Sequence, residues 1–379
     1  MIKHFYITTT NTITQLQSLN KGYSPIIAAN QQDKLGWLIT GLVQSDGSFG
    51  MRIIKYKNSI RIRLVLVIEM TIASLPLLEQ VRSYFGCGSI NIDKKRNTCI
   101  FTITDLSALL HIVVPHFLKY PLFGAKYLSF YKFLRVLILI YPIKGSNYDK
   151  LTLAKAVYLG WDINGTSYRK EEELYNILQT LLPSLNFVNP SSSYAEKVAT
   201  KEAIENELGI TKSRDILNSS SKYLEQNKIY TINPYFILGV IEGDGSFYVG
   251  LRSNGKIRFG FNITTSFDDI MLLHKIKTAL GCGNVKQKAL SWCRYEVEGN
   301  KDLRTILMCI VKIGPFGDKL LGSKSNNYEI FRKVMEIFIQ KGHMEKQGLR
   351  QIANLVYSGS TLKNRKLTLK EFLKKHNLN

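Results

Sequence analysis

One stretch of this chain occurs twice, and the repetition constrains the fold more than any other feature. The first copy covers residues 38–50 and the second covers residues 237–250. Each copy is a short apolar run that ends in Asp-Gly-Ser-Phe, with Asp46 in the first and Asp244 in the second. A chain of 379 residues can hold two domains of ordinary size. The repetition therefore predicts two related units in one chain.

The segments that follow the two copies correspond as well. Alternation of apolar and polar residues predicts two strands after each copy, at residues 49–54, 61–68, 247–252 and 256–261. Each pair of strands leads to an apolar helical segment followed by Gly-Cys-Gly, and glycine is the common residue after a helix C-terminus. This order predicts an α+β fold made of two pseudo-symmetric repeats.

A lysine lies at the same interval from each aspartate. Lys126 follows Asp46 by 80 residues (126 − 46), and Lys324 follows Asp244 by 80 residues (324 − 244). The matched interval indicates that the repeat extends well beyond the apolar run. We therefore expect four segments, which are an N-terminal tail at 1–30, a first repeat at 31–167, a linker at 168–230 and a second repeat at 231–379.

The positive charge of the chain lies outside the expected linker. The net charge is +22, whereas residues 168–230 carry 9 acidic and 8 basic side chains. An excess of this size favours a polyanionic partner, either a nucleic acid or an anionic membrane surface. The longest apolar run, residues 136–141, is far shorter than the ~20 residues of a membrane-spanning helix. We therefore expect no membrane association and favour a nucleic acid.

Small residues recur at a spacing of four in each apolar run. They are Gly41 and Ser45 in the first copy, and Gly239 and Gly243 in the second. On a helix, positions i and i+4 lie on one face, and small residues there let another backbone approach closely. We expect the two runs to be helices that pack together along these residues. The glycine after each aspartate is expected to end its helix.

Asp46 and Asp244 then lie together at the C-terminal ends of two adjacent helices. This end of a helix carries partial negative charge, and neighbouring carboxylates repel each other. A divalent cation between them relieves both costs, and oxygen ligands favour Mg²⁺ or Ca²⁺ over zinc. The five cysteines include no Cys-x-x-Cys pair, so they give no sign of a zinc site or a disulfide framework.

With these features, the duplicated stretch resembles the LAGLIDADG motif of homing endonucleases and intron maturases, in the single-chain form that carries two repeats. The resemblance implies an αββαββα fold in each repeat, with a two-helix interface and two antiparallel β-sheet saddles that lie on DNA. It implies that Asp46 and Asp244 are catalytic residues that bind Mg²⁺. It also implies that Lys126 and Lys324 are the catalytic lysines and that the chain is a monomer.

The implied function is that of an intron-encoded, site-specific homing endonuclease. Such an enzyme makes a double-strand cut in a long DNA target by metal-dependent phosphodiester hydrolysis. The alternative is an RNA maturase that assists splicing of its host intron, alone or in addition to cleavage, with the intron RNA as its partner. Retention of both aspartates favours the endonuclease. Members of the family are commonly encoded in organelles, so the mitochondrion is the expected location, with the chloroplast as the alternative.

The first motif departs from the family at Gln44, where an acidic residue is usual and where the second motif has Glu242. The resemblance assigns this position to capping of the helix interface. The open faces of the predicted strands carry polar and basic side chains, which can read base edges in a major groove or hold phosphates. For each arginine, an ordinary solvent-exposed strand face is the alternative. The candidates for DNA binding are Ser48, Arg52, Arg61, Arg63, Ser246, Tyr248, Arg252, Lys256 and Arg258.

Overall fold

Two halves of the same architecture make up the structure. The computed structural model describes residues 26–56, 59–141, 148–163, 171–183, 194–210, 232–288, 290–298, 303, 314–359 and 367–378. The first half contains α2 (Ile26–Asp46), β1 (Gly47–Tyr56), β2 (Ser59–Thr71), α3 (Leu75–Phe85), β3 (Ser89–Asp93), β4 (Thr98–Ile103) and α6 (Gly124–Ile140). The second half contains α11 (Pro234–Asp244), β5 (Gly245–Leu251), β6 (Ile257–Ser266), α12 (Ile270–Leu280), β7 (Asn284–Gln287), β8 (Trp292–Val297) and α14 (Ser325–Ile339).

Further helical elements complete each half. In the first half they are η1 (Ile72–Ser74), α4 (Leu106–Ala108), η2 (Leu109–Val113), α5 (Val114–Lys119) and α7 (Lys150–Gly160). In the second half they are η4 (Phe267–Asp269), η6 (Gly342–Met344), α15 (Lys346–Ser358) and α16 (Leu369–Lys375). The helices α8 (Glu171–Leu181) and α9 (Tyr194–Glu207) come from the expected linker.

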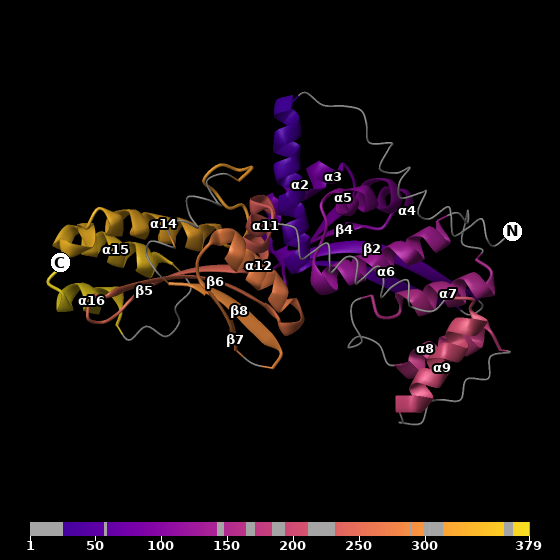
Figure 1. The fold of residues 1–379 in the computed structure, drawn as a ribbon. Helices are drawn as coiled ribbons and strands as arrows, with labels where there is room; N and C mark the ends of the chain where they lie inside the picture. Colours follow the sequence, from indigo (N-terminus) through magenta and orange to yellow (C-terminus); the bar gives the residue numbers. More distant parts are fainter. Residues whose placement is uncertain are drawn as a thin grey trace.

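Each half contains one antiparallel four-stranded sheet. The strand orders are β1-β2-β4-β3 and β5-β6-β8-β7, so the two sheets have the same topology. The prediction of an α+β fold with two αββαββα repeats is therefore confirmed. Figure 1 shows α2 and α11 side by side between the two sheets.

The phenylalanine of each duplicated motif anchors the core of its half. Phe49 lies 5.3 Å from Phe130 and from Phe133 between ring centroids, both on α6. Phe247 lies 5.3 Å from Tyr328 and 5.4 Å from Phe331, both on α14. Because strand side chains alternate between faces, this inward phenylalanine turns the preceding serine to the open face of the sheet. The motif thereby fixes which face of β1 and β5 is buried.

Glycine makes the close packing of α2 against α11 possible. A Cβ atom on Gly41 would lie 2.0 Å from Phe236 O, and a Cβ on Gly239 would lie 1.9 Å from Leu38 O. Near the ends of the helices, a Cβ on Gly243 would lie 2.5 Å from the Cβ of Ser45. The obstacles at both central glycines are backbone atoms, which cannot move aside by changing rotamer. We call this glycine-lined contact the helix seam.

Each motif helix ends at its aspartate, as expected, but the glycine that follows does not end it through a left-handed conformation. Gly245 has φ −70° and ψ 147°, an extended conformation open to any residue, so it is not a left-handed helix stop. Its Cβ would instead lie 2.4 Å from Ile241 O, and a Cβ on Gly47 would lie 2.6 Å from Val43 Cα. Space rather than backbone angle therefore requires glycine here. The expected left-handed stop does occur at Gly86 and Gly281, with φ of 65° and 66°.

The helix α2 begins at Ile26, earlier than the expected start of the first repeat at residue 31, and residues 1–25 lie outside the described part. The two linker helices are close to the first half in Figure 1, where α8 contacts α7. Tyr158 on α7 donates a hydrogen bond of 2.9 Å to Glu205 on α9. Among the described residues, no helix is both long and apolar enough to cross a membrane.

Candidate active site

The two motif aspartates meet at one end of the helix seam. Asp46 is the last residue of α2 and Asp244 is the last residue of α11. A Cβ on Gly243 would lie 3.1 Å from Oδ2 of Asp46, and the Ser45 side chain hydrogen-bonds to Asp244. Burial raises the pKa of Asp46. Burial and then repulsion from Asp46 raise the pKa of Asp244 to about 6.

The two lysines belong to the same cluster. Lys126 lies in the first turn of α6, and Lys324 directly precedes α14. The positive charges of both lysines act on Asp46 and on Asp244, where they oppose the effect of burial. Lys126 Nζ also donates a hydrogen bond of 2.5 Å to the carbonyl oxygen of Gly47. The structure thus brings all four predicted catalytic residues together, two from each half.

The chemistry of the cluster fits divalent metal ions. In the described part of the chain, no group of three or more histidine, cysteine, aspartate or glutamate residues could hold a metal ion. At the end of the seam, the protein offers the two carboxylates of Asp46 and Asp244. Mg²⁺ is commonly held by only one or two carboxylates together with water and substrate phosphates. Two half-buried, mutually repelling carboxylates with raised pKa values are the environment that such a cation stabilises.

Gln44 and Glu242 hold the chain segments that carry the lysines. Oε1 of Gln44 accepts a hydrogen bond of 2.9 Å from Phe123 N, and its Nε2 donates one of 3.2 Å to Phe123 O. Glu242 instead accepts two backbone hydrogen bonds, from Leu321 N at 2.8 Å and from Gly322 N at 3.0 Å. Each side chain thus binds the backbone shortly before the lysine of its own half. The expectation that this position caps the helix interface stays a prediction beside these contacts.

The two side chains bind the backbone with different hydrogen-bonding chemistry. A carboxylate can accept two N–H groups, whereas an amide accepts with its oxygen and donates with its nitrogen. Gly124, which follows Phe123, has φ of 51°, a conformation that glycine adopts without strain. Burial raises the pKa of Glu242 to about 7, against the opposing effect of its two backbone hydrogen bonds and of Lys324.

Two residues that the sequence did not indicate approach the lysines from the opposite half. Oδ1 of Asp269, in η4, accepts a hydrogen bond of 3.2 Å from Ala125 N. Oγ of Ser74, in η1, accepts one of 2.9 Å from Ser323 N. Ser74 and Asp269 occupy equivalent positions, since both helices that follow them begin with the next residue. Their different chemistry hides the correspondence in the sequence.

The open face of the first sheet carries three of the predicted DNA-binding arginines. In the β1–β2 ladder, Ser48 lies opposite Val67, Arg52 opposite Arg63, and Ile54 opposite Arg61. Residues 48, 52, 61 and 63 therefore share one face, and the arginines are exposed. Within the described residues, no carboxylate forms an ion pair with Arg52 or Arg63. This face can therefore offer both charges to a phosphate backbone or to guanine.

On the open face of the second sheet, several cations are paired with glutamates. Ser246 lies opposite Asn262, and Tyr248 lies opposite Gly260, where a Cβ would overlap the tyrosine ring. Arg258 forms an ion pair with Glu298, to which Tyr248 also donates a hydrogen bond of 3.3 Å. A second carboxylate, Glu296, lies within 4 Å of three basic side chains, which are Lys286, Lys288 and Arg294. Arg252 and Lys256 are exposed in the β5–β6 connection.

The glutamates on the open face of the second sheet were not among the residues indicated by the sequence. Glu296 lies opposite Asn262 in the β6–β8 ladder, which places it on the same face as Ser246. The register of β8 against β6 determines which face Glu296 occupies, and the pattern of charges in the sequence does not give that register.

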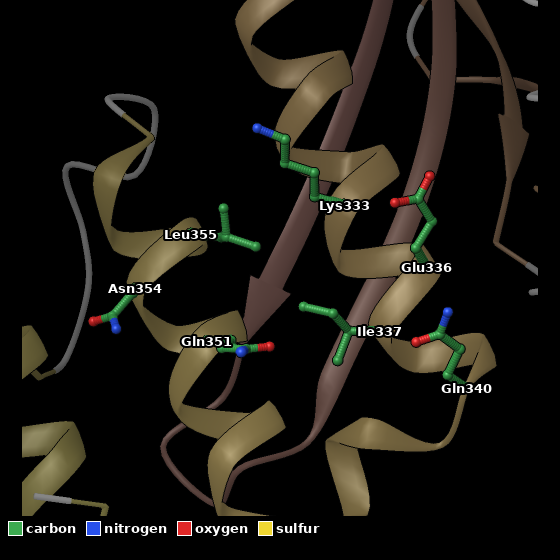
Figure 2. A pocket seen from close by; sticks show the side chains of 7 residues that line it. All are labelled: Lys333, Glu336, Ile337, Gln340, Gln351, Asn354 and Leu355. Carbon is green, nitrogen blue, oxygen red and sulfur yellow. The ribbon is translucent and has the colours of Figure 1, made fainter.

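A separate groove lies on the helical side of the second half. The groove lies between α14 and α15 and has a volume of about 450 Å³. Figure 2 shows the side chains that line it. Its lining combines amide, charged and apolar side chains, which are Lys333, Glu336, Ile337, Gln340, Gln351, Asn354 and Leu355. None of the four clustered catalytic candidates lines it, so the groove is distinct from the candidate active site.

The chain is similar to fungal endonucleases. It is 26% identical over 326 residues to "Probable intron-encoded endonuclease 2" of Neurospora crassa. The aligned region covers 84% of this chain and 63% of that relative. It is 24% identical over 273 residues to "Probable intron-encoded DNA endonuclease 1" of Mycosarcoma maydis, which covers 70% of this chain and 88% of the relative. The chain thus spans somewhat less than two thirds of the Neurospora protein.

Solved structures and a family model agree with the duplicated architecture. The I-LtrWI LAGLIDADG homing endonuclease bound to target DNA superposes with a TM-score of 0.65 at 22% identity, over 87% of this chain and 99% of that one. I-SmaMI, bound to uncleaved DNA target in the presence of calcium ions, superposes with a TM-score of 0.62 at 23% identity, over 85% of this chain and 97% of that one. The LAGLIDADG endonuclease model matches residues 39–137 and again residues 237–335, more than half of the chain. The chain therefore belongs to the LAGLIDADG endonuclease family, with both repeats of the fold in one polypeptide.

Proposed function

We propose that the protein is a site-specific DNA endonuclease that cuts both strands of a long duplex target with the help of Mg²⁺. The observation that carries this proposal is the cluster at the end of the helix seam. It combines Asp46 and Asp244 with Lys126 and Lys324, so each half contributes one carboxylate and one ammonium group. Two half-sites of this kind suit a reaction in which each strand is cut once.

The residues of the cluster have separate roles in the proposed reaction. Asp46 and Asp244 hold the divalent ions, which when bound supply an activated water molecule and neutralise charge on the leaving oxygen. Lys126 and Lys324 stabilise the negative charge that develops on the phosphate. Burial lowers the pKa of Lys126, with Asp269, Asp244 and Asp46 opposing that effect. A desolvated ammonium interacts more strongly with a nearby phosphate than a hydrated one does.

The two sheets bind the DNA on either side of the cut. The open face of the first sheet presents Arg52, Arg61 and Arg63, and that of the second presents Tyr248 and Arg258. The net charge of +22 supports binding to a polyanion. Both repeats lie in one chain, which supports action as a monomer.

The gene is proposed to lie in a mitochondrial intron. Support comes from the names of relatives, one being an uncharacterized protein in ND4 intron 1 of Podospora anserina and another an uncharacterized mitochondrial protein of Saccharomyces cerevisiae. Assistance of intron splicing is not proposed, because no observation on the described residues favours an RNA partner over DNA.

The test is cleavage of a plasmid that carries the intronless junction of the host gene. With Mg²⁺, we expect wild type to linearise this plasmid and to leave a plasmid without the junction intact. Asp46→Asn and Asp244→Asn remove one metal-binding carboxylate each and should abolish double-strand cutting while DNA binding persists. The matched control is Glu336→Gln, which also replaces a carboxylate by an amide but lies in the groove between α14 and α15. Cleavage by the two aspartate variants at the wild-type rate, or no cleavage by wild type, would reject the proposal.

A further inference from the structure

The lysine segment of each half is held by two side chains, one from each half. In the first half, Gln44 binds Phe123 and Asp269 binds Ala125, and Lys126 follows directly. In the second half, Glu242 binds Leu321 and Gly322, while Ser74 binds Ser323, and Lys324 follows. The four side chains form two equivalent pairs, related by the pseudo-symmetry of the halves.

Each pair contains one carboxylate and one neutral side chain, but the carboxylate comes from the opposite half in one pair and from the same half in the other. Beside Lys126, the neutral side chain Gln44 comes from the same half and the carboxylate Asp269 from the other half. Beside Lys324, the carboxylate Glu242 comes from the same half and the neutral Ser74 from the other. Each lysine segment therefore retains one supporting carboxylate, although the two carboxylates occupy different positions in the repeat.

Asp269 occupies a place that the first half cannot fill by itself. Ala125 is the second residue of α6, and the first N–H groups of a helix have no partner within the helix. Phe123, the residue before α6, provides no side-chain cap. A Cβ on Gly124 would lie 2.2 Å from Oδ1 of Asp269, so glycine leaves the room for this carboxylate. The negative charge of Asp269 also acts on Lys126.

We propose that Asp269 is a positioning residue of the first half-site, which aligns Lys126 from the opposite half by binding the start of α6 and by its charge. Glu242 performs the equivalent alignment of Lys324 from within its own half. Alignment of Lys126 thus depends on docking of the halves, whereas Lys324 has a carboxylate support within its own repeat. This inference rests on the proposed nuclease function for its activity readout, but not for its structural readout.

The activity test measures the nicking rate of each strand on the junction plasmid with Mg²⁺. Lys126→Ala and Lys324→Ala first identify the strand that depends on each lysine. Asp269→Ala should slow the Lys126-dependent strand by about tenfold or more, the effect of losing a charge-assisted hydrogen bond, and leave the other strand unchanged. The double variant Lys126→Ala with Asp269→Ala should be no slower than Lys126→Ala alone. The control is Asp268→Ala, which removes the exposed neighbouring carboxylate and should leave both rates unchanged.

The structural test uses the protein without DNA or metal. Hydrogen exchange at residues 123–127 should become faster in Asp269→Ala, because the Ala125 N–H loses its acceptor. Asp269→Asn retains an acceptor oxygen, so it should keep the slow exchange and lose less of the nicking rate than Asp269→Ala. Unchanged exchange in Asp269→Ala, or equal slowing of both strands, overturns the inference. If wild type does not cut the plasmid, the proposed function fails, while the exchange measurement still decides the role of Asp269.

Discussion

The helix seam makes a sharp prediction for Gly239→Ala. The added methyl carbon would lie 1.9 Å from Leu38 O, 2.7 Å from Leu42 N and 2.8 Å from Gly41 Cα. Ordinary contacts of a Cβ atom begin at 3.4 Å, so α2 and α11 must separate locally by about 1.5 Å, the difference between these distances. All three obstacles are backbone atoms, and a change of rotamer cannot relieve the overlap.

The expected loss of stability is the difference between two opposing effects. Forcing a methyl group into a packed interior costs about 1–3 kcal/mol, and the rigid backbone on the other side places this site at the upper end of that range. Replacing glycine by alanine within a helix contributes about 1 kcal/mol in the opposite direction. We therefore expect the free energy of unfolding to fall by about 2 kcal/mol. With a urea dependence of about 3 kcal/mol per molar, the unfolding midpoint falls by about 0.7 M.

The assay is urea unfolding followed by circular dichroism, with Gly250→Ala as the matched control. A Cβ on Gly250 has its nearest neighbour at 3.8 Å, so this substitution fits without displacement. Gly250→Ala should leave the midpoint close to that of wild type. The reasoning is refuted if Gly239→Ala unfolds at the same urea concentration as Gly250→Ala, because the overlap calculated at the seam then has no energetic consequence.

Two further predictions concern pH and DNA affinity. Burial raises the pKa of Glu242 from 4.5 to about 7, so the folded protein binds this proton more tightly than the unfolded chain does. This contribution to the free energy of unfolding is complete below pH 4.5 and is lost as the pH rises from 4.5 to about 7. Glu242→Gln does not titrate at this position, so its free energy of unfolding, measured with urea, should rise relative to that of wild type over the same pH interval. A difference between the two proteins that stays constant with pH would contradict burial as the cause of the raised pKa. Arg52→Ala should reduce the slope of log Kd against log salt by about 1, measured by fluorescence anisotropy with duplex DNA. Arg258→Ala should reduce the slope less, because Glu298 already pairs with Arg258. An equal reduction of the slope in Arg52→Ala and Arg258→Ala would contradict this expectation.

The duplicated stretch made most of the fold predictable. Period-two alternation located the first two strands of each half, and the inward phenylalanine of the motif determined their buried face. The role of Gly47 and Gly245 was not predictable in the same way. A glycine after a helix can supply either a left-handed angle or empty space. The φ of −70° at Gly245, and the 2.4 Å between a Cβ placed there and Ile241 O, show that Gly245 supplies space.

The candidate site was predictable only where the repeats retain the same chemistry. Asp46, Asp244, Lys126 and Lys324 stood out because each pair is identical and equally spaced. Asp269 and Ser74 are equivalent in space but differ in type, and each acts on a segment from the other half. Comparison of the repeats by residue identity therefore could not find them. Likewise, the ion pairs of Glu296 depend on which face of β8 it occupies, which follows from strand register.

The helix seam also bears on how far the two halves are interchangeable. Its central contacts join glycine to backbone atoms, which every sequence possesses, so the seam itself cannot tell one related half from another. The flanking contacts of Ser74 and Asp269 differ between the two sides, so they are one source of discrimination between halves. A chimaera that joins one half to a foreign repeat can therefore dock correctly and still leave a lysine segment unsupported. Recombining such halves calls for transplanting the η1 or η4 turn together with the lysine segment that it contacts.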